Sequence, residues 1–265
     1  MSVLKNAKRV VIKVGTSSLT YPTGALNFRR IEHLVKVLSD LKNAGKEIIL
    51  VSSGAIGVGV GELGLPERPK DTPTKQACAA VGQCELMYIY DKAFGAYNHT
   101  VAQILLTGAD FDHKERLDNF RNTLFRLLEL DALPIINEND TIVTDEISIG
   151  DNDTLAALVA VNAGAELLVL LSDIDGLYTA DPHKHSDATL IHEVAALTPE
   201  ILALAEGKGS ELATGGMSTK LSAAKIATAQ GCDMIITNGK NPQVLYDILD
   251  SIPTGTRFLR KGAVK

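Results

Sequence analysis

The sequence has 265 residues, of which 45% are hydrophobic and 22% are charged, so it can bury a large core in one domain or in two closely joined lobes. Its net charge of −6 gives no general attraction to nucleic acid. The absence of tryptophan and an aromatic share of only 5% also argue against a surface on which bases stack.

Short β-branched runs alternate along the chain with longer amphipathic segments. The predicted strands are Val10–Val14, Glu47–Ser52, Thr100–Leu106, Leu133–Asn137, Leu167–Ser172 and Asp233–Thr237. The first predicted helix follows an N-cap at Asn27 and ends before Gly45. The later helices are Thr74–Phe94, Arg116–Glu129, Asp151–Ala163 and Met217–Ala229. This alternation predicts an α/β fold, namely a three-layer αβα sandwich with a mostly parallel, open sheet.

No Pro/Gly-rich linker divides the chain, so we expect a single domain, 1–265, of two lobes that share one sheet and meet near residue 165. Polar and apolar residues alternate over Thr141–Ile149, which predicts a small hairpin or an antiparallel edge strand. In open α/β sheets, ligands bind at the carboxyl ends of the strands. The segments that follow the strands are therefore the candidate sites.

Two glycine patterns bear on phosphate binding. The P-loop pattern GxxxxGK[ST] does not occur in the sequence. Gly59–Gly64 matches GxGxxG, but the preceding strand ends near Ser52, too early for a dinucleotide-binding turn. We expect these glycines to serve close packing and loop bends.

Lys13 lies inside a strand that is predicted to be buried. A buried lysine is costly unless an anion accompanies it, although a lysine on an edge strand could instead reach solvent. In the functional interpretation, its ammonium group lies at the carboxyl end of the strand. Gly15, Thr16, Ser17 and Ser18 would then form a phosphate cradle beside it.

Three further strand ends carry polar residues. Ser52-Ser53-Gly54-Ala55 opens a helix, where free N–H groups could hold an anion or serine could simply cap the helix. Asn137-Glu138-Asn139-Asp140 is either a solvated turn or a substrate site whose acidic side chain suits an ammonium group. Ser172-Asp173 precedes Gly176–Pro182, a loop of suitable size to contact a nucleotide.

Two helix starts complete the candidate site. Gly150-Asp151-Asn152-Asp153-Thr154 either caps its helix or directs one carboxylate to a catalytic lysine, with Asn152 contacting substrate. Thr214-Gly215-Gly216-Met217-Ser218-Thr219-Lys220 could bring backbone N–H groups and a lysine to phosphates, or could be a flexible loop before a capped helix. His183 and His185 have HxH spacing without supporting ligands, so we predict no metal site there.

Seven segments in this order resemble the amino-acid kinase family, and within it the branch that phosphorylates glutamate. They cover essentially the whole chain: VVIKVGTSSL (10–19), LVSSGAIGVG (50–59), KQACAAVGQ (75–83), INENDTI (136–142), GDNDTLAALVA (150–160), LLSDIDGLYTADP (170–182) and TGGMSTKLSAA (214–224). Ser172 stands where threonine is also common, which keeps the hydroxyl group. Many members of this branch carry a C-terminal PUA domain, which we do not expect here.

The resemblance implies ATP-dependent phosphorylation of the side-chain carboxylate of L-glutamate to L-glutamyl 5-phosphate, the first step of proline biosynthesis. It implies that the 1–165 lobe binds glutamate through Ser53, Gly54, Asp140 and Asn152. The 166–265 lobe would bind ATP, together with Lys13, through Ser172, Asp173, Thr214, Gly215, Gly216, Met217, Ser218, Thr219 and Lys220. Lys13, Lys220 and Asp153 would be catalytic, with Asp153 orienting both ammonium groups.

The expected chemistry needs no general base, because a glutamate side chain with a pKa of about 4.3 is already anionic near neutral pH. We expect the two lysines to neutralise the transferring phosphoryl group, with Mg²⁺ carried mainly by the ATP phosphates. Rival interpretations are N-acetylglutamate kinase, aspartokinase, uridylate kinase, carbamate kinase, or a non-catalytic amino-acid sensor. Asp140 favours a substrate with a free amino group.

The remaining expectations concern partners and location. The resemblance suggests proline as a feedback inhibitor, a homo-oligomer (dimer or tetramer), and glutamyl-phosphate reductase as a functional partner. Three cysteines without CxxC spacing predict reduced thiols. No apolar stretch approaches about 18 residues, and Val10–Val14 is too short for a signal peptide. We therefore expect a cytoplasmic protein without a nucleic-acid or membrane partner.

Overall fold

The computed structural model describes residues 3–21, 25–142, 152–182, 184–204 and 216–262. The chain forms two compact units. We call Val14–Asn152 the continuous part, and Met1–Lys13 together with Asp153–Lys265 the split part. Within the described ranges, no helix combines the length and the apolar character that crossing a membrane requires.

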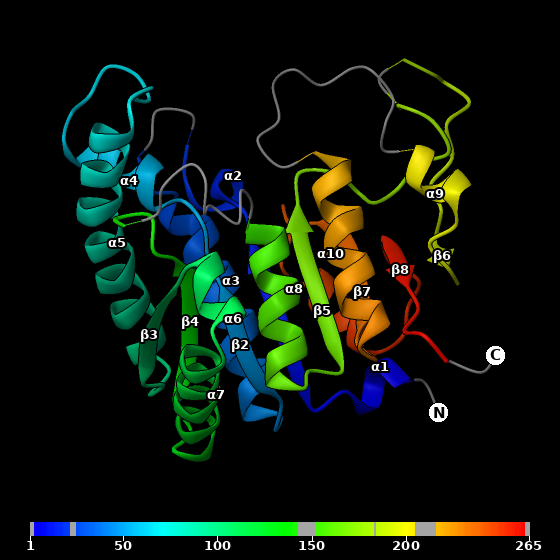
Figure 1. The fold of residues 1–265 in the computed structure, drawn as a ribbon, viewed down its shortest axis with the longest axis horizontal. Helices are drawn as coiled ribbons and strands as arrows, with labels where there is room; N and C mark the ends of the chain where they lie inside the picture. The colour runs from blue at the N-terminus through cyan, green and yellow to red at the C-terminus, as the bar shows by residue number, and fades with distance from the viewer. Residues whose placement is uncertain (1–2, 22–24, 143–151, 183, 205–215, 263–265) are drawn as a thin grey trace. The chain divides into compact units, whose positions relative to one another are not determined.

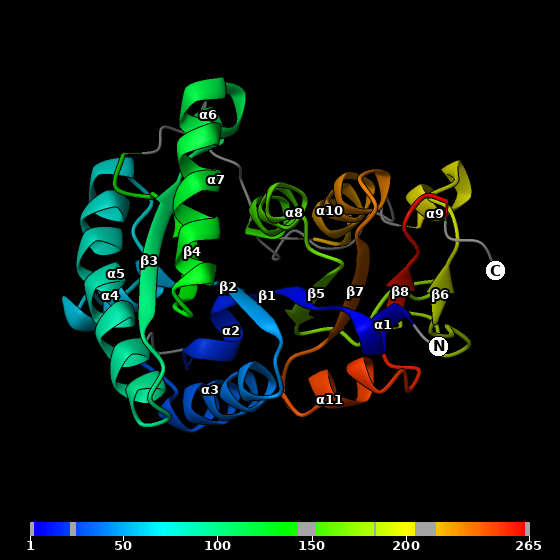
Figure 2. The same ribbon diagram turned by 90° about the horizontal axis from the view of Figure 1, so that it is seen from below.

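The continuous part is built on three parallel strands in the order β3-β4-β2 (Figure 1). These strands are β2 (Glu47–Val51), β3 (Val101–Leu106) and β4 (Leu133–Glu138). Figure 2 shows that α7 and α3 lie on opposite sides of these strands. The helices of this part are α2 (Thr16–Leu19), α3 (Phe28–Asn43), α4 (Ala55–Glu62), α5 (Thr72–Gly95), α6 (Gly108–Asp112) and α7 (Lys114–Glu129).

Local chemistry sets the limits of the helices. The side chain of Asn27 accepts a hydrogen bond from the backbone N–H of Arg30, which caps α3 as predicted. Gly45, just beyond the end of α3, has a φ of 89°, a conformation that glycine adopts without strain. Asp71 caps α5 through the N–H of Thr74 at 2.9 Å, so this helix begins slightly earlier than its apolar pattern predicted.

Two glycines let α4 and α5 approach closely. A Cβ atom at Gly59 would overlap the backbone carbonyl of Cys78 on α5, and one at Gly82 would overlap the carbonyl of Ala55 on α4. Gly64 bends the loop after α4 with a φ of 63°. The expectation that the GxGxxG glycines serve packing and bending is thus confirmed for Gly59 and Gly64.

The split part contains five strands in the order β1-β5-β7-β8-β6. They are β1 (Arg9–Val14, whose last residue opens the continuous part), β5 (Leu167–Ser172), β6 (Glu193–Val194), β7 (Asp233–Asn238) and β8 (Thr256–Phe258). β5 and β7 are parallel, as are β6 and β8, whereas β8 runs antiparallel to β7. The sequence analysis did not predict β6 or β8.

Helices cover both faces of these strands. Figure 2 shows α8 and α10 on one side of β5 and β7, and α11 on the other. The helices are α1 (Val3–Asn6), α8 (Asn152–Ala163, from its second residue onward), α9 (Pro199–Ala203), α10 (Met217–Ala229) and α11 (Val244–Leu249). The strands β5 and β7 are almost entirely buried, as their apolar sequences predicted.

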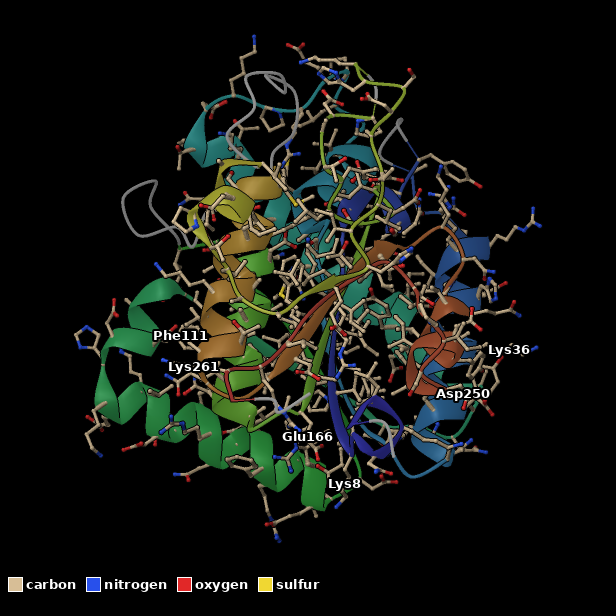
Figure 3. All side chains as sticks on the ribbon, turned by 90° about the vertical axis from the view of Figure 1, so that its right-hand side faces the viewer. Lys8, Lys36, Phe111, Glu166, Asp250 and Lys261 are labelled. Carbon is tan, nitrogen blue, oxygen red and sulfur yellow. The ribbon has the colours of Figure 1, made fainter. Side chains whose placement is uncertain are left out.

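Acidic side chains hold the strand starts of the split part. Glu166, just before β5, accepts hydrogen bonds from the backbone N–H groups of Lys8 and Arg9 at 2.7 and 2.9 Å (Figure 3). Asp233, at the start of β7, is buried and accepts a hydrogen bond from the side chain of Arg257 at 2.6 Å. These carboxylates fix where the strands begin.

The predicted α/β class with mostly parallel strands is confirmed. The compact units differ from the predicted division near residue 165, because residues 1–13 and 153–165 group with the C-terminal part. Residues 143–149 of the predicted hairpin lie outside the described residues, and Thr141 and Ile142 form a turn after β4.

We expect Gly59→Ala to destabilise the protein by about 1–3 kcal/mol, because the added methyl group meets backbone atoms that cannot move aside. Gly95→Ala, at the end of α5 with open space around the added atom, is the matched control and should be neutral or slightly stabilising. Urea denaturation of both variants measures the difference. Equal stability of the two would show that the α4–α5 contact tolerates a side chain.

Candidate active site

Three charged side chains meet inside the split part. Lys13 comes from β1, Asp153 from the first turn of α8, and Lys220 from the first turn of α10. Lys13 Nζ lies 2.6 Å from Asp153 Oδ1, and Lys220 Nζ donates to Asp153 Oδ2 at 3.0 Å. Asp153 is 0% exposed and the lysines are 8% and 6% exposed. The structure therefore brings together the three residues that were predicted to be catalytic.

The electrostatics of this cluster follow from its burial. Burial by itself raises the pKa of Asp153, but the ammonium groups of Lys13 and Lys220 outweigh it, so the pKa of Asp153 is lowered overall. The carboxylate stays ionised and both lysines share it. The formal charges of Lys13, Asp153 and Lys220 add up to +1, in an environment that is largely shielded from solvent. Such a cluster attracts anions, and a polyphosphate fits it chemically.

Other predicted nucleotide-binding residues belong to the same part. The hydroxyl group of Ser172, at the end of β5, donates to Asp173 Oδ1 at 3.1 Å, and the side chain of Asp173 is exposed. Gly216 is the N-cap of α10 and has no side chain that could bond to the first N–H groups of the helix. The Thr219 hydroxyl donates to the Gly216 carbonyl at 2.8 Å. Thr214 and Gly215 lie outside the described residues.

A second group of polar residues lies within the continuous part, around Asn152. The Asn152 side-chain amide donates to the carbonyl of Ser52 at 3.0 Å, to the hydroxyl of Ser53 at 2.8 Å and to Asn137 Oδ1 at 3.0 Å. These acceptors fix the orientation of the amide. In the described residues, Asn152 Oδ1 is buried without a hydrogen-bond partner, so it remains an acceptor for a donor on a ligand.

Two residues on α5 support this group, and the sequence analysis did not assign them a role. The side-chain amide of Asn137 donates to Gln83 Oε1 at 2.8 Å. The hydroxyl groups of Tyr90 and Ser52 share a hydrogen bond of 3.0 Å, and Tyr90 is fully buried. In the sequence, the signal for their role was that Gln83 and Tyr90 place polar atoms on the otherwise apolar, buried face of a long helix. Their partners, however, lie 38 and 54 residues away in the sequence.

Asp140 follows β4 in the same part and is half-buried. Burial raises the pKa of its carboxyl group above the usual range, and the Arg68 guanidinium partly opposes this effect. Glu138, in the same segment, is buried. A half-buried carboxylate such as that of Asp140 is able to pair with a cationic group on a ligand.

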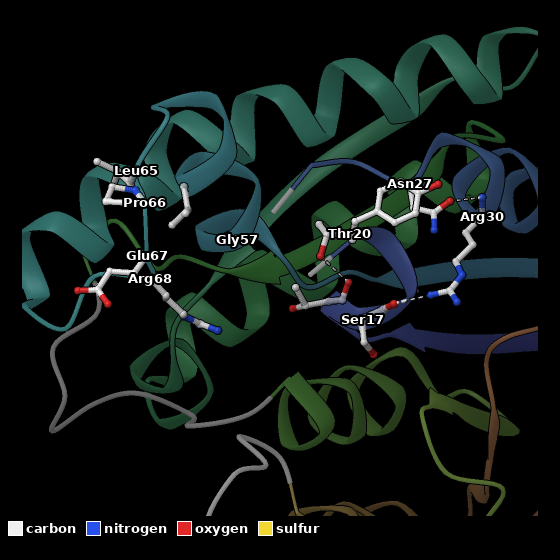
Figure 4. A pocket seen from close by; sticks show the side chains of 12 residues that line it. Ser17, Thr20, Asn27, Arg30, Gly57, Leu65, Pro66, Glu67 and Arg68 are labelled. Atoms are coloured by element: carbon white, nitrogen blue, oxygen red, sulfur yellow. Dashed lines mark hydrogen bonds between the residues drawn. The ribbon is translucent and has the colours of Figure 1, made fainter. Parts of the chain in front are cut away.

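A cavity of about 600 Å³ lies in the continuous part (Figure 4). Its lining combines apolar residues, among them Val60, Leu65 and Pro66, with polar and charged ones, which are Thr16, Ser17, Thr20, Tyr21, Asn27, Arg30, Glu67 and Arg68. Thr16 and Ser17 belong to the segment predicted to cradle phosphate, and they form the first turn of α2. The phosphate role of this segment stays a prediction.

Several predicted features fall outside the described residues, namely Gly150 and Asp151 before α8 and His183 of the HxH pair. Among the residues that the structure does describe, no group of three or more His, Cys, Asp or Glu side chains is placed to hold a metal ion.

Comparison with known sequences gives a consistent result. The model of the amino acid kinase family matches residues 8–238. A protein named glutamate 5-kinase from Clostridium perfringens is 53% identical over 262 residues, which cover 97% of each chain. A glutamate 5-kinase from Listeria innocua is also 53% identical, over 97% of this chain and 95% of the other. The relative from Carboxydothermus hydrogenoformans, with the same name, is 52% identical, and the match spans 70% of its length.

Solved structures show the same fold. Carbamate kinase from Giardia lamblia, bound to AMP-PNP, superposes with a TM-score of 0.67 at 20% identity and covers 97% of this chain and 100% of its own. Isopentenyl phosphate kinase from T. acidophilum gives a TM-score of 0.66 at 20% identity, with coverages of 94% and 99%. UMP kinase from Bacillus anthracis gives 0.66 at 16% identity, with 97% of each chain covered. At these identities, the likeness establishes the fold alone.

We expect Asp153→Asn to cost about 3–5 kcal/mol of stability at neutral pH, because two buried ammonium groups lose their counter-charge. Because the folded-state pKa of Asp153 is lowered, its contribution is complete above the ordinary Asp pKa of about 3.9 and is lost as the pH falls through the lowered value. The difference between variant and wild type should therefore narrow in acid. Urea denaturation across pH measures this trend.

The control is Asp118→Asn, which removes an exposed Asp–Lys pair of similar length on α7 and should leave the denaturation midpoint unchanged. If Asp153→Asn were as stable as this control at neutral pH, the buried cluster would not be held by its carboxylate.

Proposed function

The chain belongs to the amino acid kinase family, and we propose that it transfers the γ-phosphoryl group of ATP to the side-chain carboxylate of L-glutamate, forming L-glutamyl 5-phosphate in the first step of proline biosynthesis. The observation that carries this proposal is 53% identity over 97% of both chains to a protein named glutamate 5-kinase. The buried Lys13–Asp153–Lys220 cluster supplies the phosphate chemistry that such a reaction needs.

We assign glutamate binding to the 1–165 lobe. Asp140 would pair with the substrate ammonium group, which would give its half-buried carboxylate a counter-charge. Asn152 would accept a hydrogen bond from the same group through its unpartnered Oδ1 atom. Ser53 and Gly54, which precede α4, would bind the substrate from the start of that helix.

We assign ATP to Lys13 and to the 166–265 lobe. Ser172 is the last residue of β5 and Asp173 follows it, a position at which nucleotide contacts are common in α/β folds. The segment Thr214–Lys220 would bring glycine backbone, the start of α10 and the Lys220 ammonium group to the phosphates.

The chain's residues have a simple task in the reaction. The glutamate carboxylate is already anionic, so it attacks phosphorus without a base, and the bond from the γ-phosphorus to the bridging oxygen of ADP breaks. Lys13 and Lys220 would lower the repulsion between the two anions, and Asp153 would hold both ammonium groups in place. Mg²⁺ on the ATP phosphates would add further charge neutralisation.

The main alternative is another kinase of this family, such as N-acetylglutamate kinase. Acetylation removes the ammonium charge, and the half-buried Asp140 carboxylate would then lose its proposed ligand partner. A non-catalytic amino-acid sensor is the second alternative. The intact cluster of Lys13, Asp153 and Lys220 argues against a sensor, because binding an amino acid alone does not require it.

The other proposed properties follow from the family resemblance. We propose that proline inhibits the enzyme, that it forms a dimer or tetramer in the cytoplasm, and that its product passes to glutamyl-phosphate reductase. These proposals are separate from the catalytic assignment, and each can fail without affecting it.

A coupled ADP-release assay with Mg·ATP tests the substrate. We expect turnover with L-glutamate, and little with N-acetylglutamate, aspartate or UMP. Adding proline to the glutamate reaction tests inhibition in the same experiment. Turnover with N-acetylglutamate but none with glutamate would replace the proposed substrate, and activity with none of the four would favour the sensor.

Lys13→Met and Lys220→Met should each lower kcat by at least about 100-fold while changing glutamate affinity much less, because these groups act on the phosphoryl transfer. Each variant keeps one lysine beside Asp153, so the fold should survive. Lys36→Met, on the exposed face of α3, is the control for loss of a lysine. Steady-state kinetics with calorimetric glutamate binding would separate the two effects, and near-normal kcat in either variant contradicts its catalytic role.

A further inference from the structure

The cavity of the continuous part borders the proposed substrate residues on two sides. On one side, the Thr16 methyl group lies 3.5 Å from the position that a Cβ atom of Gly54 would occupy. On the other side, Arg68 lines the cavity and acts electrostatically on Asp140. The cavity is thus next to the residues to which we assign glutamate binding, but none of its lining residues has been given a role in binding the amino acid.

The first turn of α4 faces this cavity, since Gly57 is one of its lining residues. The first N–H groups of a helix have no partner within the helix, and the N-cap Gly54 makes no side-chain bond to them. Gly54 has a φ of 100°, so a residue with a capping side chain would be strained there. This end of the cavity therefore offers N–H donors and the positive end of a helix dipole.

Arg68 brings a full positive charge to the same cavity. Figure 4 shows its side chain extending from the Leu65–Arg68 segment toward the wall that carries Ser17. Among the described residues, no carboxylate forms an ion pair with Arg68. The other lining arginine, Arg30, donates to the carbonyl of Ser17 at 2.7 Å and thereby holds α3 against α2. Arg68 thus has no direct ion pair among the described residues, and its charge acts electrostatically on Asp140.

We propose that this cavity receives the α-carboxylate of the amino-acid substrate, and that Arg68 is the residue that recognises it, assisted by the first turn of α4. The inference rests on the proposed function, because it divides the amino-acid head group between Asp140 for the ammonium group and Arg68 for the carboxylate. An arginine fork matches a carboxylate geometrically, and its charge makes each hydrogen bond stronger. A cavity of about 600 Å³ has room for the head group and bound water.

This division has a consequence for specificity. A compound that keeps the ammonium group and the reacting carboxylate but lacks the α-carboxylate should lose the direct contributions of Arg68 and of the first turn of α4. 4-Aminobutyrate is that compound. Wild-type enzyme should use it much less well than glutamate, and changes at Arg68 should affect this weak activity much less than they affect the activity with glutamate.

The test compares Arg68→Met with Lys70→Met, which removes a positive charge from an exposed position two residues later in the same loop. For L-glutamate, Arg68→Met should raise KM about 10–100-fold with kcat within about threefold, since a hydrogen bond between charged groups is lost. For 4-aminobutyrate, kcat/KM should fall by a much smaller factor than for L-glutamate. Arg68→Lys should recover part of the glutamate KM, and Lys70→Met should resemble wild type throughout.

The outcomes are distinguishable from failure of the proposed function. If wild-type enzyme releases no ADP with glutamate, the proposed reaction fails, and the cavity is then judged by thermal shift with glutamate and 4-aminobutyrate as ligands. An equal loss for both compounds in Arg68→Met, in kcat/KM or in thermal shift, would mean that Arg68 supports the fold. An unchanged glutamate response in that variant would remove it from the site.

Discussion

The buried carboxylate of Asp153 is the constraint on which the split part depends. Two lysines inside a protein interior repel each other and each costs several kcal/mol to desolvate, so neither could stay there without a shared anion. Asp153 supplies that anion and, by doing so, ties β1, α8 and α10 to one point. The same arrangement leaves an excess of one positive charge. The side chains to which we assign phosphate binding are therefore the same ones that hold these three elements together.

The group around Asn152, to which we assign glutamate binding, is organised mainly by neutral side chains. The Asn152 amide is oriented by its hydrogen bonds to the carbonyl of Ser52 and to Asn137 Oδ1. On α5, Tyr90 in turn holds the Ser52 hydroxyl, and Gln83 holds the Asn137 side chain. An amide that is fixed on its nitrogen side presents its oxygen in one direction, which suits recognition of an ammonium group. Charge enters at Asp140 and Arg68, where a charged ligand can complete the pairing. The charged lysine cluster and the hydrogen-bonded group around Asn152 thus suit different tasks. Recognition of one amino acid depends on directional hydrogen bonds, whereas transfer of a phosphoryl group depends on neutralising negative charge.

Many features of the fold and of the candidate site could be predicted from the sequence, because they depend on residues that are close together along the chain. A few neighbouring residues are enough to predict the strands of consecutive apolar residues, the Asn27 cap of α3 and the lysine inside β1. What the sequence could not predict depends on distant contacts. Gln83 meets Asn137 across 54 residues, Arg68 comes from a loop without regular structure, and the strands β6 and β8 are only two and three residues long. The division at Lys13 and Asp153 was also hidden, because it follows packing and no linker marks it.

The GxGxxG match shows how one pattern can serve a different physical need. In a dinucleotide-binding turn, glycine makes room for phosphate. Here Gly59 makes room for the backbone of α5 at Cys78, and Gly82 on α5 makes room for the backbone of α4 at Ala55. This mutual approach locks α4 in place, and α4 carries Gly54 and Gly57 at the end that faces the cavity. Gly59 and Gly82, which do not line the cavity, thus set the position of the N–H groups at the start of α4. In this way, the packing of α4 against α5 determines where the proposed anion site lies.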